Sequence, residues 1–350
     1  MSTERITNGG RSRTGWGGKT RSSNVEVLRI IATFFILFIH ANFWSLGKPT
    51  IDDMIANPID AWCRTLFEAA GIIAVNCFVF ISGWFGINFK LKGLVNFLFQ
   101  SSFFYIGTTI FLLLIGIYSV NRNIIIRMTF ADNWYIMSYL LLLIFSPVLN
   151  AYIKSASRKS YRILLILFWG FALTYGFRSE STFNGGYSPI FFFGLYLLIR
   201  YIRIYNPKWI AFPIYVDLLI YVSCSILMAL VWCCLRINCF TYLNPLVIIS
   251  TIYFSLIFTK FKFKNKSINW FAASSFAAYL LHTSPCLRDG YQAFFKNLWC
   301  TNTTVMFWMK AILVIFAIMI VAIVIDQLRI RIYKMLVMKI NIDRMLEKIY

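Results

Sequence analysis

Residues 25–45 read VEVLRIIATFFILFIHANFWS, an apolar stretch whose only titratable side chains are Glu26, Arg29 and His40. A helix needs about 20 mostly apolar residues to cross the roughly 30 Å hydrocarbon core of a bilayer, and this stretch is long enough. The whole chain has the same character, because 59% of its 350 residues are hydrophobic and 13% are charged. In soluble domains, hydrophobic residues average about 45 to 50% and charged residues about 25%. The sequence therefore predicts an all-α, polytopic integral membrane protein.

Further apolar stretches of similar length follow almost without pause, which gives about ten transmembrane helices in all. The expected spans are 25–45, 66–87, 94–118, 133–152, 161–178, 186–205, 211–235, 242–260, 268–286 and 304–328. We expect them to form one membrane domain over residues 25–328, between basic tails at 1–24 and 329–350.

The formal net charge of +21 is distributed unevenly along this layout. Lys and Arg gather in the amino tail, in every even-numbered loop and in the carboxyl tail; Lys90 and Lys92, for example, follow the second span. Because basic residues are retained on the cytoplasmic side, both termini are expected in the cytoplasm of a multi-pass cell-membrane protein, in bacteria the inner membrane. Topology and contact with anionic membrane lipids account for the charge, so we expect no nucleic-acid partner.

The chain contains only two histidines, His40 and His282, and both fall inside expected spans. Each lies about 14 residues from the cytoplasmic start of its span, which at 1.5 Å per residue places both about 21 Å deep. The matched depth, in the outer half of the membrane, is an argument for a functional role of both. The alternative is that each is a structural histidine bonded within the bundle.

Arg29 precedes His40 by close to three helical turns, so the two side chains share a face about 16 Å apart along the axis. A guanidinium inside a span usually faces the bundle interior or a water-filled path. We therefore expect Arg29 to bind an anion in a conduit that leads to His40, unless it snorkels to the headgroups. Glu68, near the same level as His40, could orient the imidazole or face interfacial water. Asp217 could pair with Arg29 or face headgroups.

Asn133, Trp134 and Tyr135 open the fourth expected span from the outer side. Interfacial belts are rich in Trp and Tyr, which is one explanation of this run. The other is a stacking platform for a sugar ring near His40. A phosphate-binding loop at Gly18-Lys19-Thr20 is excluded, because Arg13 occupies the position of the required glycine. No spacing of cysteines or histidines indicates a metal site.

Four segments, in order, resemble the acyltransferase type 3 family, whose members are membrane-bound and modify cell-surface polysaccharides and other acceptors. They are the run from Arg29 to His40, the run from Cys77 to Gly86, Asn133 to Tyr139, and Tyr279-Leu-Leu-His282. The resemblance covers nearly the whole chain. It implies transfer of an acyl group, typically acetyl, from cytoplasmic acyl-CoA to a glycan hydroxyl on the far side.

The resemblance also implies roles for individual residues. His40 would be the catalytic base, with Glu68 beside it, although an acyl-histidine intermediate is a second route. The expected donor-binding residues are Arg29, Lys90 and Lys92. The acceptor would be a glycan or a lipid-linked sugar, and the residues expected to contact it or to orient the base are Asn133, Trp134, Tyr135, Tyr279 and His282. Acyl-CoA enters as a co-substrate, and no permanently bound cofactor or metal is expected.

An alternative function is a transporter or flippase for a lipid-linked sugar. Many transmembrane spans and charged residues inside the bilayer are also typical of such proteins. The sequence shows no internal repeat of the kind that builds many transporters. A glycan polymerase is a weaker third hypothesis, because the expected outer loops are short.

Overall fold

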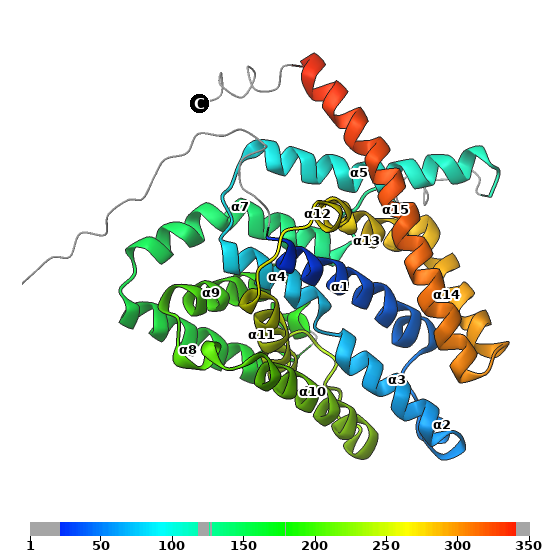
Figure 1. Cartoon of the computed structure of the whole chain (residues 1–350), viewed down its shortest axis with the longest axis horizontal. Coiled ribbons are helices and arrows are strands. Elements are labelled where there is room, and N and C mark those ends of the chain that lie inside the picture. Colours follow the sequence, from blue (N-terminus) through cyan, green and yellow to red (C-terminus); the bar gives the residue numbers. More distant parts are fainter. Residues whose placement is uncertain (1–21, 118–125, 127, 179, 341–350) are drawn as a thin grey trace, which may run out of the picture.

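The computed structural model describes residues 22–117, 126, 128–178 and 180–340, and all regular secondary structure in them is helical (Figure 1). The all-α prediction is therefore confirmed for the described residues. The helices in order are α1 (Ser23–Ile39), the π-helix η1 (His40–Trp44), α2 (Ile51–Ala56), α3 (Pro58–Gly71), α4 (Ala74–Phe85), α5 (Leu91–Leu114), α7 (Trp134–Ser155), α8 (Arg158–Tyr175), the 3-10 helix η2 (Asn184–Gly186), α9 (Pro189–Tyr205), the 3-10 helix η3 (Lys208–Ala211), α10 (Ile214–Leu230), the π-helix η4 (Val231–Leu235), α11 (Pro245–Lys260), α12 (Lys266–Ala273), α13 (Ser275–Thr283), α14 (Pro285–Cys300) and α15 (Thr304–Ile340).

Six helical stretches in the described part of the chain are long and apolar enough to cross a bilayer. They are Ser23–Trp44, Pro58–Phe85, Leu91–Leu114, Trp134–Ser155, Ile214–Leu235 and Thr304–Leu336. Each coincides with an expected span, so the membrane character is borne out, but the predicted count of about ten is not confirmed. The other expected spans fall on α8, α9, α11 and the α12–α13 region, which do not meet both criteria.

The expected span 268–286 is not one continuous helix but is divided between α12, α13 and the start of α14. The chain breaks at Ser274 and again at Ser284, whose backbone is extended (φ −60°, ψ 136°). Pro285 explains the second break, because a proline ring disfavours helical geometry in the preceding residue. The break places His282 in the last turn of α13.

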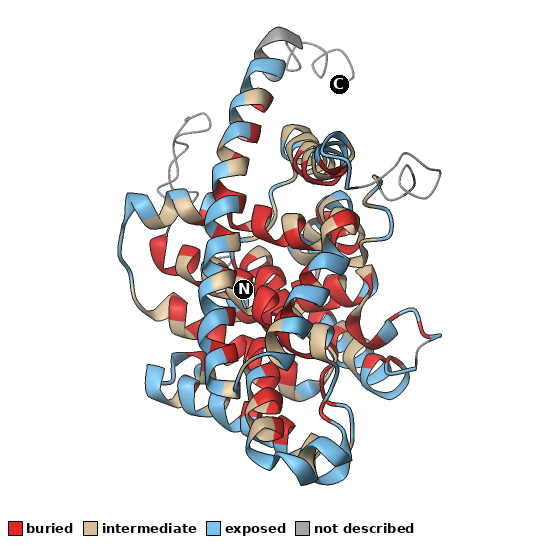
Figure 2. Ribbon diagram, turned by 90° about the vertical axis from the view of Figure 1, so that its right-hand side faces the viewer, coloured by how far each residue is buried: buried red, intermediate tan, exposed pale blue. Residues whose placement is uncertain are grey.

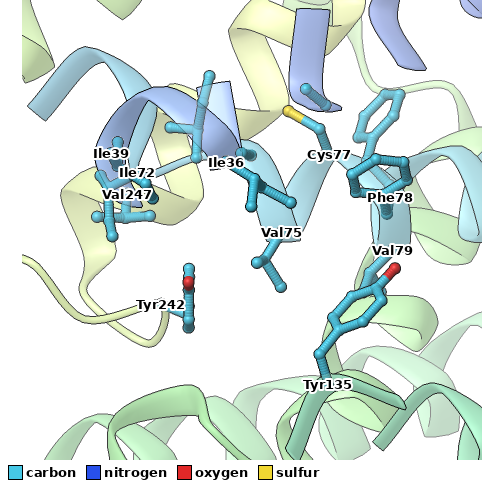
Figure 3. Close-up of a cluster of buried hydrophobic side chains, with 14 of the residues drawn as sticks. Ile36, Ile39, Ile72, Val75, Cys77, Phe78, Val79, Tyr135, Tyr242 and Val247 are labelled. Atoms are coloured by element: carbon cyan, nitrogen blue, oxygen red, sulfur yellow. The ribbon is translucent and has the colours of Figure 1, made fainter. Parts of the chain in front are cut away.

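Helix α1 lies at the centre of the bundle, where it contacts α3, α4, α11, α12, α13 and α15 (Figure 1). Leu28, Ala32 and Ile36, spaced four residues apart along one face, are almost completely buried. Figure 3 shows Ile36 of α1 beside Val75 of α4, with Tyr242 and Tyr135 approaching the same apolar cluster from other segments. The central position of α1 fixes the environment of His40, which directly follows it.

Outer helices leave apolar side chains exposed, as a lipid-facing surface requires. On α15 buried and exposed residues share the helix along most of its length (Figure 2), and Leu313 and Val324 are 67% and 63% exposed. This helix continues past the expected span end at 328. It buries an ion pair there, with Arg329 Nε 2.8 Å from Asp326 Oδ1.

Candidate active site

The two histidines lie in direct contact. Nδ1 of His40 is 2.8 Å from Nε2 of His282, and Nδ1 of His282 is 2.8 Å from the carbonyl oxygen of Ala278. The π-helix η1, which directly continues α1, supplies the first ring and α13 supplies the second, and α1 and α13 are in contact. Counting residues from the sequence predicted that the rings lie at one depth, and the structure brings them together.

The partners of the two rings assign their tautomers. A carbonyl oxygen only accepts, so Nδ1 of His282 carries a proton and donates it to Ala278. The Nε2 of a neutral His282 then accepts, and Nδ1 of His40 must be the donor. This leaves the lone pair of His40 on Nε2. In this arrangement His40 can accept a proton at Nε2, and the contact with His282 orients its ring.

The chain turns from α-helical to π-helical at His40. The His40 backbone N–H lies within bonding distance of the carbonyls of both Ile36 and Leu37, and the Leu37 carbonyl also accepts from the Tyr291 hydroxyl at 2.6 Å. The His40 carbonyl accepts from Ser45 Oγ at 2.6 Å. π-Helical turns are rare and frequent at functional sites. The hydrogen bonds from the Tyr291 and Ser45 side chains stabilise this π-helical turn, which backbone hydrogen bonds alone would stabilise less.

Glu68 supports the same turn but does not orient the imidazole. Its Oε2 accepts from Asn42 Nδ2 at 3.0 Å and from the Phe43 backbone N–H at 3.4 Å. Arg64 Nε also donates to Asn42 Oδ1 at 3.3 Å. The expected Glu68 to His40 pair is replaced by the contact between the two histidines, because π-helix η1 presents Asn42 and Phe43 to the carboxylate.

His40 lines a cavity of about 550 Å³, whose walls also carry Trp44, Lys48, Glu68, Asn133 and Trp134. This volume is within the usual range of small-molecule sites, about 300 to 1,000 Å³. His282 is buried, with 3% of its surface exposed. We call this space the outer cavity, after the side of the membrane that the expected topology gives it; a molecule in it would meet His40 directly and His282 only through His40.

Three aromatic rings form one wall of the outer cavity. The ring centroids of Trp134 and Tyr187 are 4.7 Å apart, those of Tyr187 and Tyr242 are 4.7 Å apart, and those of Trp134 and Tyr242 are 5.3 Å apart. Trp44 approaches His40 itself, with 4.4 Å between centroids. We call Trp134, Tyr187 and Tyr242 the aromatic wall.

Asn133 links the cavity to the helix that carries His282. Its side chain accepts from the Ile136 N–H as the N-cap of α7, accepts from the Tyr279 hydroxyl at 2.9 Å, and donates to the Tyr105 hydroxyl at 2.7 Å. Tyr279 lies one turn before His282. Both Asn133 and Tyr279 line the outer cavity. Tyr135 points elsewhere: it is 4% exposed and packs in the core, so the structure separates it from its neighbour Trp134.

Lys90 and Lys92 line a second cavity, of about 540 Å³, at the start of α5 and beside the first half of α7. Its remaining lining residues are Ile87, Asn88, Phe89, Gly93, Leu94, Asn96, Phe97, Gln100, Tyr139 and Leu143. The loop that forms its floor is fixed, because the Ile87 N–H donates to the Tyr196 hydroxyl at 3.1 Å and the Ile87 carbonyl accepts from Asn150 at 2.8 Å. We call this space the inner cavity; Lys90 and Lys92 are the charged residues of its otherwise uncharged and largely apolar lining.

Aromatic side chains separate the two cavities. Tyr135 lies between Tyr279 of the outer cavity and Tyr139 of the inner one, with centroid distances of 5.1 and 6.0 Å. Phe276 lies between Tyr279 and Phe97 in the same way, at 5.7 and 5.6 Å. We call Tyr135 and Phe276 the aromatic barrier.

A comparison with protein-family models matches residues 22–327 to the acyltransferase domain of the acyltransferase type 3 family. The match spans nearly all of the described chain and includes both cavities. The chain belongs to this acyltransferase family. Comparisons with curated proteins and with solved structures return no match.

The position of Arg29 in this acyltransferase differs from the expected conduit. Its Nε lies 3.2 Å from Glu26 Oε2, one turn away on α1, and the lining residues of the two cavities do not include it. Neither of these two cavities includes Arg29 in its lining, so the expectation that Arg29 and His40 line one continuous passage stays a prediction. Asp217 bonds to Lys260, so it is not the partner of Arg29.

The acyltransferase site contains residues that the sequence analysis did not identify, namely Trp44, Lys48, Tyr187, Tyr242 and Tyr291. They lie in loops or in otherwise ordinary apolar runs, where residue type carries no signal. Partial burial lowers the pKa of Lys48, while the Glu68 carboxyl acts in the opposite direction. In the described part of the chain, no group of three or more His, Cys, Asp or Glu residues could hold a metal ion.

Proposed function

We propose that this acyltransferase moves an acyl group, acetyl in the simplest case, from cytoplasmic acyl-CoA to a hydroxyl of a cell-surface or lipid-linked glycan. The observation that carries the proposal is the chain from Ala278 O through His282 to His40, because it leaves an unprotonated Nε2 on a ring that lines the outer cavity. A base positioned in this way typically contributes about 10² to 10⁴-fold to a rate.

The proposed topology has about ten membrane-crossing helices and both termini in the cytoplasm. It assigns the inner cavity, with Lys90 and Lys92, to the cytoplasmic side, and the outer cavity to the opposite side. Ammonium groups suit the phosphates of an acyl-CoA. The pantetheine arm is long enough to carry a thioester across the aromatic barrier when those side chains move aside.

In the proposed reaction, a glycan hydroxyl donates its proton to His40 Nε2 as the oxygen attacks the thioester carbonyl. The carbon–oxygen bond forms, the carbon–sulfur bond breaks, and the CoA thiolate takes the proton from the His40 imidazolium. His282 stabilises that imidazolium, because its Nε2 accepts from His40 Nδ1. The aromatic wall suits a sugar ring, whose C–H face packs on aromatic surfaces.

The reaction is tested with the purified protein in proteoliposomes, supplied with radiolabelled acetyl-CoA and a panel of glycans. The proposal expects release of CoA thiol in equal amount to acylated glycan. Movement of a lipid-linked sugar across the membrane, without any thiol release, would instead support the transporter or flippase alternative.

A further inference from the structure

We infer that the acceptor is an acidic sugar of the uronic acid class, held by its carboxylate at Lys48 while its ring lies against the aromatic wall. This inference rests on the proposed acyl transfer and names the class of acceptor that the outer cavity takes. Its basis is the way in which the protein fixes Lys48 and the charges around it.

Two arginines hold the backbone on either side of Lys48. The side chain of Arg64, from α3, donates to the carbonyl of Gly47, and Arg236 Nη1 donates to the carbonyl of Pro49 at 3.0 Å. Arg236 follows π-helix η4, in an αL conformation (φ 58°). Elements far apart in sequence thus fix a loop that has no regular structure of its own. Such anchoring reduces the entropy lost when a loop residue binds a ligand.

The Lys48 side chain points along an aromatic edge of the outer cavity. Its Nζ lies 5.0 Å from the Trp232 ring centroid and 6.0 Å from that of Phe240, and both Lys48 and Phe240 line the cavity. In the described part of the chain no carboxylate oxygen lies within 4.0 Å of this ammonium, since the ion pairs there are formed by Arg29, Lys260, Arg288 and Arg329. Among the described residues, the exposed Lys48 ammonium therefore forms no ion pair within 4.0 Å, and the Glu68 carboxyl of the same cavity acts on it only from farther away.

The other charged residues of the outer cavity are engaged or offset. The Glu68 carboxylate already accepts from Asn42 and Phe43. Arg288 pairs with Asp289. The charges of Arg288 and Asp132 also act on the Tyr105 hydroxyl in opposite directions and so offset each other there. One unpaired ammonium matches one carboxylate, and a charge-assisted hydrogen bond of this kind is about twice as strong as a neutral one.

The aromatic wall supplies the second half of the site. Trp134, Tyr187 and Tyr242 present ring surface in the cavity that also contains Lys48 and His40. A pyranose with a carboxylate at one edge has an apolar face for the wall, an anion for Lys48 and hydroxyls for the His40 base. A neutral sugar would leave Lys48 without an ionic partner, and so would bind more weakly.

The test compares methyl glucuronoside with its uronamide, which keeps every ring hydroxyl and removes only the charge. Acyl transfer from labelled acetyl-CoA is measured in proteoliposomes with wild-type protein and with the Lys48→Ala, Lys48→Gln and Lys48→Arg variants. Wild type should prefer the acid by about 10- to 100-fold in kcat/KM, the range of one charge-assisted hydrogen bond. Lys48→Ala and Lys48→Gln should remove this preference through KM, and Lys48→Arg should retain most of it.

The matched control is Lys310→Ala, since the Lys310 ammonium bonds to Asn302 at 2.6 Å and does not line the outer cavity. This variant should keep the wild-type preference. Equal rates on acid and amide by wild type, or an equal loss on both probes in Lys48→Gln, would overturn the inference while acyl transfer stands. Transfer to neither probe also overturns it. Thiol release that is the same in wild type and in His40→Ala would overturn the proposed function as well.

Discussion

His40 Nδ1 and His282 Nε2 lie 2.8 Å apart although 242 residues separate them in the chain. Because Ala278 O fixes the proton of His282, the pair has a direction, and the free lone pair is on the ring that lines the outer cavity. The proposed chemistry depends on this direction.

His282 acts through His40, so its replacement should change the rate constant and leave donor binding intact. We expect His282→Leu to lower kcat by about 10² to 10⁴-fold, the usual contribution of an acid–base group, with the KM for acyl-CoA unchanged. His282→Gln should retain more activity, because an amide oxygen can accept from His40 Nδ1. The measurement is steady-state kinetics at several donor concentrations. Equal activity of the Leu and Gln variants would contradict an orienting role.

Glu68 should matter for stability more than for chemistry. In Glu68→Ala, the Phe43 N–H loses the Glu68 acceptor and Asn42 Nδ2 keeps only its bond to the Arg64 carbonyl, and an unpaired buried group costs about 1 to 3 kcal/mol. Thermal unfolding in detergent should show a lower Tm. Glu68→Gln keeps an acceptor oxygen at the same place, so its Tm and its rate should remain close to wild type. A Gln variant that is stable but as inactive as His40→Ala would assign a catalytic carboxylate instead.

Six of the expected spans were predictable from apolarity alone, because the hydrocarbon core sets both the length and the composition of a crossing helix. The common depth of the histidines followed from counting residues at a fixed rise. The pairing itself could not be predicted. It depends on the break at Ser284, which ends α13 just after His282, and on the π-helix that begins at His40.

The walls of the two cavities show a second limit of sequence reasoning. Trp134 and Tyr135 are adjacent and chemically alike, yet one lines the outer cavity and the other lies in the core. Lys48 lies in a loop whose shape is fixed by Arg64 and Arg236 from distant elements. Such tertiary contacts leave no periodic pattern in the sequence.

Lys90 and Lys92 should determine donor affinity. Replacing either with Ala should raise the KM for acyl-CoA by about 10- to 100-fold, the effect of one lost charge-assisted hydrogen bond, with little change in kcat. The control is Lys154→Ala, an exposed lysine in the last turn of α7 that does not line the inner cavity.

Arg29→Gln should raise the KM for acyl-CoA less than the lysine variants do, because the Arg29 side chain pairs with Glu26 and is not among the lining residues of the inner cavity. A KM effect confined to Arg29→Gln would restore the role that the sequence predicted for it and would remove the donor role of the two lysines.

The aromatic barrier should limit access of water to the thioester. Phe276→Ala would open the contact between Phe97 and Tyr279, and we expect more acyl-CoA hydrolysis in the absence of acceptor, since closed sites suppress such side reactions. Phe316→Ala removes a phenyl ring that is 48% exposed on α15 and should leave hydrolysis at the wild-type rate. Unchanged hydrolysis in Phe276→Ala would show that this ring does not separate the two cavities.

The most direct test of the central claim is acyl transfer by His40→Ala in proteoliposomes, with labelled acyl-CoA on one side and glycan on the other. We predict a folded, monodisperse protein that binds acyl-CoA as wild type does and transfers no label above background. Transfer at the wild-type rate by this variant would contradict the assignment of His40 as the base.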